Sequence, residues 1–192
     1  MGPETFEELE ARGFGNNEDM AASAVTLSLD EFHARYANEH GYEYWFGEVV
    51  RKSMPTWLHG LIQAILCEFF YRLGYAAGSE IELRIDPNWQ PRPDVTASLE
   101  LEEPYPTKPV DIVAEVLSDD AMTTVYEKCR NYTRIGIRQI FVFDPQARTA
   151  WEWSREAENL ERVEELRLGN GARVAVAEIW AELERRMNVK RG

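Results

Sequence analysis

The segment 110–118 constrains the fold most, because it is a long apolar run, VDIVAEVLS, with acidic residues inside it. Runs of this composition are typical of a strand in the middle of a sheet, covered on both faces. The residues after it favour a helix over 121–135 that ends at Gly136, and QIFVFDP at 139–145 is a second apolar strand. Strand, helix and strand in this order predict parallel neighbours joined by a crossover. We therefore expect an α/β fold with a central mixed sheet flanked by helices.

Shorter patterns predict the other elements. The capping pattern S-x-x-E begins a helix over 28–38, and the aromatic and β-branched residues of 42–52 predict two short strands joined by a turn. The segment 57–73 has large apolar residues at helical spacing, which indicates a core helix. The sequence IELRI at 81–85 alternates apolar with charged residues and predicts a half-buried strand. Later patterns predict a strand at 149–153, a hairpin at 166–176 and a helix at 177–187.

The length of 192 residues suits one domain, since single cores grow comfortably to about 150 to 250 residues. We expect a loosely ordered acidic lead segment at 1–26 and one folded domain at 27–192. No stretch reaches the roughly 18 apolar residues that span a bilayer, and the first residues lack a signal-peptide pattern, so we expect a cytoplasmic location. Cys67 and Cys129 lack metal-site spacing, and both are expected to be reduced and structural.

The formal net charge of −13 argues against a protein that coats nucleic acid, because phosphate contacts depend on Lys and Arg. It does not exclude a metal-dependent hydrolase, which concentrates carboxylates at its site and can keep a local basic strip. The sequence has no glycine-rich phosphate loop, G-x-S-x-G or H-E-x-x-H pattern. Nucleotide-binding, serine-hydrolase and zinc-protease functions therefore lack their signatures.

Asp94, Glu115 and Lys128 are the residues that suggest chemistry. Asp94 follows Pro93 at the start of a predicted strand, and Glu115 lies inside the apolar run, where an unpaired charge is costly. If the two strands are neighbours, their carboxylates meet, and Mg²⁺ favours such oxygen ligands. Lys128, on the next helix, could orient a water and stabilise developing negative charge. A structural ion pair between Glu115 and Lys128 or an arginine explains the same residues.

The order of these motifs resembles the bacterial putative restriction endonuclease family of the PD-(D/E)XK superfamily. The resemblance covers roughly 29–153. It rests on Pro-Asp at 93–94, Glu115 on an apolar strand that ends Leu-Ser, Lys128 and Tyr132 on one helix, Gly-Ile-x-x-Ile at 136–140, a strand that ends Asp-Pro, YEYWFGEVV at 42–50, and His59 early in the next helix.

The resemblance implies a restriction-endonuclease-like core that hydrolyses DNA with Mg²⁺, which Mn²⁺ could replace. It implies Asp94 and Glu115 as metal ligands and Lys128 as the catalytic lysine. The superfamily pattern expects Lys two residues after Glu115, where this chain has Leu117, so Lys128 is interpreted as a migrated replacement. A homodimer is expected as well, because two active sites are needed to cut both strands at once.

Three further residues could support the site. Tyr132, one helical turn after Lys128, could hold that lysine or contact substrate, or it could simply pack on the sheet. Glu48 could be an extra metal ligand and His59 a phosphate contact. A strand-edge glutamate and a capped or solvated histidine are equally good interpretations of these two residues.

Two other functions stay open at this stage. A nuclease-like fold without activity could serve as a binding or assembly module, and the acidic charge favours this alternative. An enzyme acting on another phosphorylated substrate, or an acidic interaction protein, is the second alternative. Neither has a motif of its own in the sequence.

Overall fold

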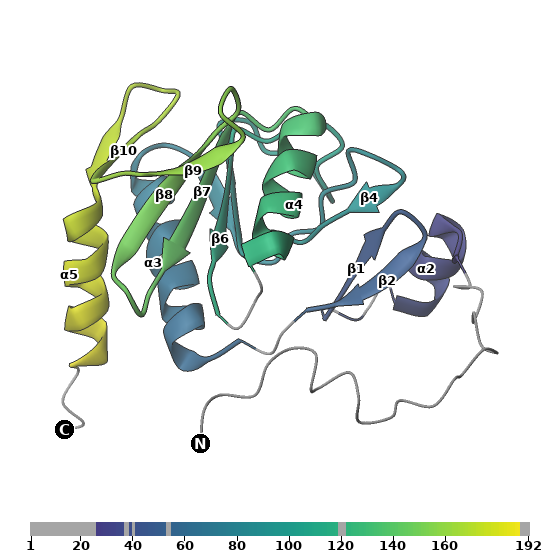
Figure 1. Ribbon diagram of the computed structural model, residues 1–192, viewed down its shortest axis with the longest axis horizontal. Helices are drawn as coiled ribbons and strands as arrows, with labels where there is room; N and C mark the ends of the chain where they lie inside the picture. The colour runs from purple at the N-terminus through teal and green to yellow at the C-terminus, as the bar shows by residue number, and fades with distance from the viewer. Residues whose placement is uncertain (1–25, 37–38, 40, 53–54, 119–121, 189–192) are drawn as a thin grey trace, which may run out of the picture.

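The computed structural model describes residues 26–36, 39, 41–52, 55–118 and 122–188. The expected lead segment at 1–26 lies outside these residues except for Thr26. The described elements form a mixed α/β arrangement with a central sheet between helices, which confirms the predicted fold class (Figure 1). None of the described helices combines the length and apolar composition that crossing a membrane requires.

The central sheet has six strands in the order β3, β5, β6, β7, β8, β9. Strand β6 (Ile112–Val116) lies between β5 (Val95–Ser98), to which it is antiparallel, and β7 (Gln139–Asp144), to which it is parallel. Helix α4 (Met122–Arg134) connects the parallel pair, so the predicted crossover is confirmed. The remaining strands are β3 (Ala76–Gly78), β8 (Thr149–Ser154) and β9 (Asn159–Arg162).

Helices cover the two faces of this sheet (Figure 1). Helices α3 (Trp57–Arg72) and α5 (Val176–Met187) share a core with one face, and α4 shares a second core with the other. Side chains of β6 alternate between them, since Ala114 belongs to the first core and Val113 to the second. Glu115 therefore faces α4. The hairpin of β10 (Glu165–Arg167) and β11 (Arg173–Ala175) adds to the first core.

A smaller sheet lies beside the α4 face. It consists of β1 (Tyr42–Trp45), β2 (Glu48–Arg51) and β4 (Trp89–Gln90), in the order β2, β1, β4. Trp45 and Trp89 belong to the same core as α4, with ring centroids 5.9 Å apart. Helix α2 (Leu29–Tyr36) packs on β1 and begins with the predicted capping box, in which the Ser28 N–H donates to a Glu31 carboxylate oxygen at 3.0 Å.

The predicted strand at 81–85 is wrong. The Leu83 N–H donates to the Pro91 carbonyl, and the Arg84 N–H donates to the Pro106 carbonyl. Proline has no N–H to donate in return, so neither neighbour can continue a reciprocal strand ladder. The edge strand of the sheet is β3 instead, which pairs with β5.

Substitution of Gly136, which follows the end of α4, tests whether this position requires a residue without a Cβ. Its φ is +96°, and a Cβ there would lie 2.9 Å from the Pro109 Cγ. We expect Gly136→Ala to lower the free energy of unfolding by about 2–4 kcal/mol, combining left-handed strain with overpacking. Gly171 is the control, because its φ is +86° but a Cβ would meet nothing within 4 Å. Gly171→Ala should cost only about 1–2 kcal/mol in urea unfolding, and equal losses would contradict the packing argument.

Candidate active site

Asp94 lies directly before β5, opposite Glu115 on β6. The register pairs Val95 with Ala114, so one step further along each strand sets the two acidic residues across from each other. Cross-strand neighbours have Cβ atoms about 5 Å apart and share a face of the sheet. Asp94 Oδ2 accepts a hydrogen bond from the Val116 backbone N–H at 2.7 Å. Asp94 is 4% exposed and Glu115 is 5% exposed, so two carboxylates meet in the protein interior.

Helix α4 supplies the partners of Glu115. The Lys128 ammonium lies 2.9 Å from Glu115 Oε2, and the Tyr132 hydroxyl donates to Glu115 Oε1 at 2.5 Å. Lys128 and Tyr132 are one helical turn apart, so they project from the same side of α4. Tyr132 is fully buried, and its ring packs against Trp89 with centroids 5.0 Å apart. Both oxygens of Glu115 are thus held by side chains that the sequence had singled out.

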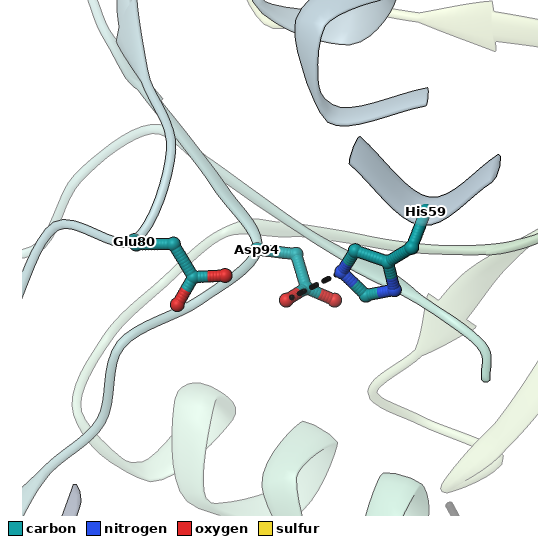
Figure 2. A group of neighbouring side chains, drawn as sticks. All are labelled: His59, Glu80 and Asp94. Atoms are coloured by element: carbon teal, nitrogen blue, oxygen red, sulfur yellow. Dashed lines mark ion pairs between the residues drawn. The ribbon is translucent and has the colours of Figure 1, made fainter. Parts of the chain in front are cut away.

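Helix α3 supplies partners for the other carboxylate. The Thr56 side chain accepts a hydrogen bond from the His59 N–H at 3.2 Å, and this cap fixes the first turn of the helix. His59 Nε2 then lies 3.2 Å from Asp94 Oδ1. One turn later, the Gln63 amide donates to Glu80 Oε1 at 2.8 Å. Figure 2 shows the Asp94 carboxylate between Glu80 and the His59 ring.

Lys52, which directly follows β2, reaches the same place from the small sheet. Its ammonium donates to Glu80 Oε2 through a short contact, to the Arg92 carbonyl at 2.7 Å and to Asp94 Oδ1 at 3.3 Å. A lysine ammonium has three donors, so these contacts use all of them. The side chain is 13% exposed. Lys52 therefore joins two acidic side chains from separate loops of the chain.

Glu43 is the third buried carboxylate of this region. It lies on β1, is 1% exposed, and accepts hydrogen bonds from the Arg92 backbone N–H at 2.8 Å and from the Trp45 indole at 2.9 Å. Burial lowers the pKa values of Lys52 and Lys128, but Asp94 beside Lys52, Glu115 beside Lys128 and, after them, Glu43 raise both pKa values overall. The small sheet thus contributes negative charge as well as Lys52 to the cluster.

Burial and charge push the pKa values of the two central carboxylates in opposite directions. Burial disfavours charge on Asp94, but the hydrogen bond with His59 and the Lys52 ammonium outweigh it and lower the pKa of Asp94. Burial raises the pKa of Glu115 to about 7, and the Lys128 ammonium opposes that rise. Neighbouring carboxylates with separated pKa values are typical of catalytic and metal sites.

Of the six residues chosen from the sequence, five lie together. They are Asp94, Glu115, Lys128, Tyr132 and His59. Glu48 lies elsewhere, as an exposed residue at the turn end of β2 opposite Trp45. Among the described contacts, none links Glu48 to the other five. The glutamate of this hairpin that does enter the region is Glu43.

Sequence reasoning missed Lys52, Glu80, Gln63 and Glu43. Glu43 and Gln63 had a weak signal, because each is a polar residue within an apolar segment that was expected to be buried. Glu80 and Lys52 had none. Glu80 has a φ of +58°, and its N–H donates to the Pro93 carbonyl, so its position follows from a turn that brings two loops together.

The donor set fits a divalent cation. His59, Glu80 and Asp94 each offer a ligand atom, and these atoms lie within 4.8 Å of one another. Carboxylate oxygens suit Mg²⁺ and Mn²⁺, and an imidazole nitrogen can complete a site for the softer of these ions. Glu115 is the cross-strand neighbour of Asp94, so a further carboxylate lies near a cation bound at Asp94. Such an ion could polarise a phosphate and lower the pKa of a bound water.

Glu80 also lines a cavity of about 780 Å³ between β3 and the loop at 99–106. The lining is rich in carboxylates, which include Glu82, Glu100, Glu102, Glu103 and Asp111. Phosphate contacts depend on Lys and Arg. An acidic cavity of this kind is therefore a poor path for a nucleic-acid backbone.

The mixed sheet and its buried carboxylates and lysine define a fold of the nuclease type. The chain belongs to the family of putative restriction endonucleases called Uma2, whose model matches residues 29–188, and this confirms the resemblance seen in the motifs. A solved structure of a putative nuclease from Anabaena variabilis is similar, with a TM-score of 0.68 and 19% identity. The match covers 82% of this chain and 99% of that one, and at this identity it concerns the fold. A search of curated proteins found no match.

The contact between His59 and Asp94 predicts a measurable titration. Burial lowers the pKa of His59, but the hydrogen bond and charge of Asp94 raise it more, so the net pKa lies above 6.5. In Asp94→Asn, burial and Lys52 act without that charge, and the pKa of His59 should fall below the value in the parent protein. The imidazole C–H resonances in proton NMR report this directly, because the chain has three histidines.

The same contact has a defined effect on stability. Because the folded-state pKa of His59 is raised, its contribution is fully present below pH 6.5 and is lost as the pH rises through the folded-state value. The stability difference between the parent protein and Asp94→Asn should therefore shrink over that window. A pKa of His59 that is unchanged by Asp94→Asn would contradict the assignment.

Proposed function

We propose that this protein is a divalent-metal-dependent endonuclease that hydrolyses DNA phosphodiester bonds. Membership of a family of putative restriction endonucleases gives the reaction class. The observation that carries the proposal is the convergence of Asp94, which directly precedes β5, Glu115 of β6 and Lys128 of α4 at one buried position. Fold likeness alone does not give an activity, so the site has to support the claim.

In this proposal, Asp94 and Glu115 hold Mg²⁺, which Mn²⁺ can replace, and His59 and Glu80 lie close enough to assist. The low pKa of Asp94 keeps it ionised, which suits a metal ligand. The bound ion would lower the pKa of a water and neutralise phosphate charge. Lys128 would turn from Glu115 toward the attacking water or the phosphate oxygen, and Tyr132 would hold Glu115 in place.

The proposed DNA substrate and homodimer have to be compatible with the acidic charge of the chain. The net charge of −13 makes binding through a wide basic surface unfavourable, so the proposal places most DNA affinity at the metal and a few basic side chains. Binding should weaken as salt increases. A homodimer, which would bring two sites to one duplex, and a cytoplasmic location both stay predictions.

A plasmid-nicking assay with Mn²⁺ or Mg²⁺ tests the proposal. Asp94→Asn, Glu115→Gln and Lys128→Met should each lower the nicking rate by about 100-fold or more, because each removes a metal ligand or a charge that stabilises the transition state. Glu48→Gln is the matched control, since Glu48 is an exposed carboxylate away from the cluster and its rate should be unchanged. A chelator should abolish nicking by the parent protein.

The inactive-fold alternative makes the opposite prediction. Under it, Glu115 and Lys128 form a structural ion pair, removing one partner costs about 3–5 kcal/mol of stability, and the site itself does not cleave DNA. Circular dichroism on the same variants separates unfolding from lost chemistry. The alternative is supported if the parent protein does not nick DNA with either metal, or if all folded variants nick equally, because the activity then does not come from this site.

A further inference from the structure

Lys52 occupies the place where a cation bound to Asp94 and Glu80 would have to lie. Its ammonium donates to Asp94 Oδ1 at 3.3 Å and to Glu80 Oε2 through a shorter contact, and a third hydrogen bond to the Arg92 carbonyl at 2.7 Å fixes it there. These are the two carboxylates of the group whose ligand atoms lie within 4.8 Å of one another. One ammonium therefore bridges the oxygen pair that a divalent ion needs.

The anchoring of Lys52 makes this position specific. The Lys52 backbone N–H donates to the Gly41 carbonyl at 2.9 Å, so the residue that follows β2 is tied to the start of the hairpin. The Gln63 amide holds the other oxygen of Glu80 at 2.8 Å and turns its free edge toward the ammonium. Both ends of the Lys52–Glu80 contact are thus held by other parts of the fold.

An ammonium and a divalent cation cannot share these oxygens. At separations of a few ångströms, like charges repel strongly wherever water is largely excluded. Here the side chain of Lys52 is 13% exposed and that of Asp94 is 5% exposed, so screening is weak. Lys52 must leave Asp94 and Glu80 before an ion takes both.

We propose that Lys52 is an internal competitor for the divalent cation, and that its ammonium sets how tightly the Asp94–Glu80 side of the site binds metal. The inference deepens the proposed nuclease function and rests on a cation binding at Asp94. Ion entry therefore requires the Lys52 ammonium to leave these carboxylates. The residue is a positioning residue, since its effect passes through the carboxylates.

Mn²⁺ binding to the full chain without DNA tests the proposal, with free Mn²⁺ measured by electron paramagnetic resonance. Lys52→Met should bind Mn²⁺ at least about tenfold more tightly than the parent protein, because the repelling charge is removed and the oxygens are released. Lys52→Arg keeps the charge and should stay within about threefold of the parent. Lys108→Met is the control for loss of one lysine, because Lys108 is exposed, and it should leave affinity unchanged.

A second variant tests the shared carboxylate without changing Lys52. Glu80→Gln removes one of the shared carboxylates, so its Mn²⁺ affinity should fall by about tenfold, and the gain from Lys52→Met should shrink in the Glu80→Gln background. A thermal shift on adding Mn²⁺ should be larger for Lys52→Met than for the parent protein.

The outcomes separate this inference from the nuclease proposal. If Lys52→Met binds Mn²⁺ more tightly but the parent protein fails to nick DNA, the competition is supported and the nuclease function is overturned. Equal or weaker binding by Lys52→Met overturns the competition, whatever the nicking assay gives. No Mn²⁺ binding by either the parent protein or Lys52→Met also overturns it.

Discussion

The compensation of buried negative charge is the constraint on which this structure depends. Antiparallel pairing of β5 with β6 sets Asp94 opposite Glu115 inside the protein, where isolated carboxylates are costly. Each surrounding layer provides one cationic group: His59 comes from α3, Lys128 from α4 and Lys52 from the end of β2. Removing any layer would take one cationic partner away from Asp94 or Glu115.

This arrangement gives the small sheet a role in the site. The β1–β2 hairpin carries Glu43 into the buried region and places Lys52 against Asp94. The backbone N–H of Arg92, two residues before Asp94, donates to Glu43, and the Arg92 carbonyl accepts a hydrogen bond from the Lys52 ammonium. The loop that presents Asp94 is therefore fastened to the hairpin through backbone groups of Arg92.

How well each residue of the site could be predicted depended on how far apart in the sequence the interacting residues lie. Glu115, Lys128 and Tyr132 lie within one strand–helix unit, and Asp94, directly before a neighbouring strand, is part of a recognisable Pro-Asp pair, so local patterns sufficed for them. The failure at 81–85 had a related cause, because alternation predicts a strand only when the neighbouring backbone can donate hydrogen bonds. There the neighbours include Pro91 and Pro106.

The sequence by itself determined the sheet with its parallel crossover, the helix that carries Lys128, and the family, since these depend on hydrophobic period, caps and motif order along the chain. Only the tertiary structure decided that Glu43 rather than Glu48 enters the cluster, and that Lys52 and Glu80 meet at Asp94. The physical reason is that these contacts join segments distant in the chain. Their geometry depends on how one hairpin and one left-handed turn pack on the finished sheet, and no local pattern encodes it.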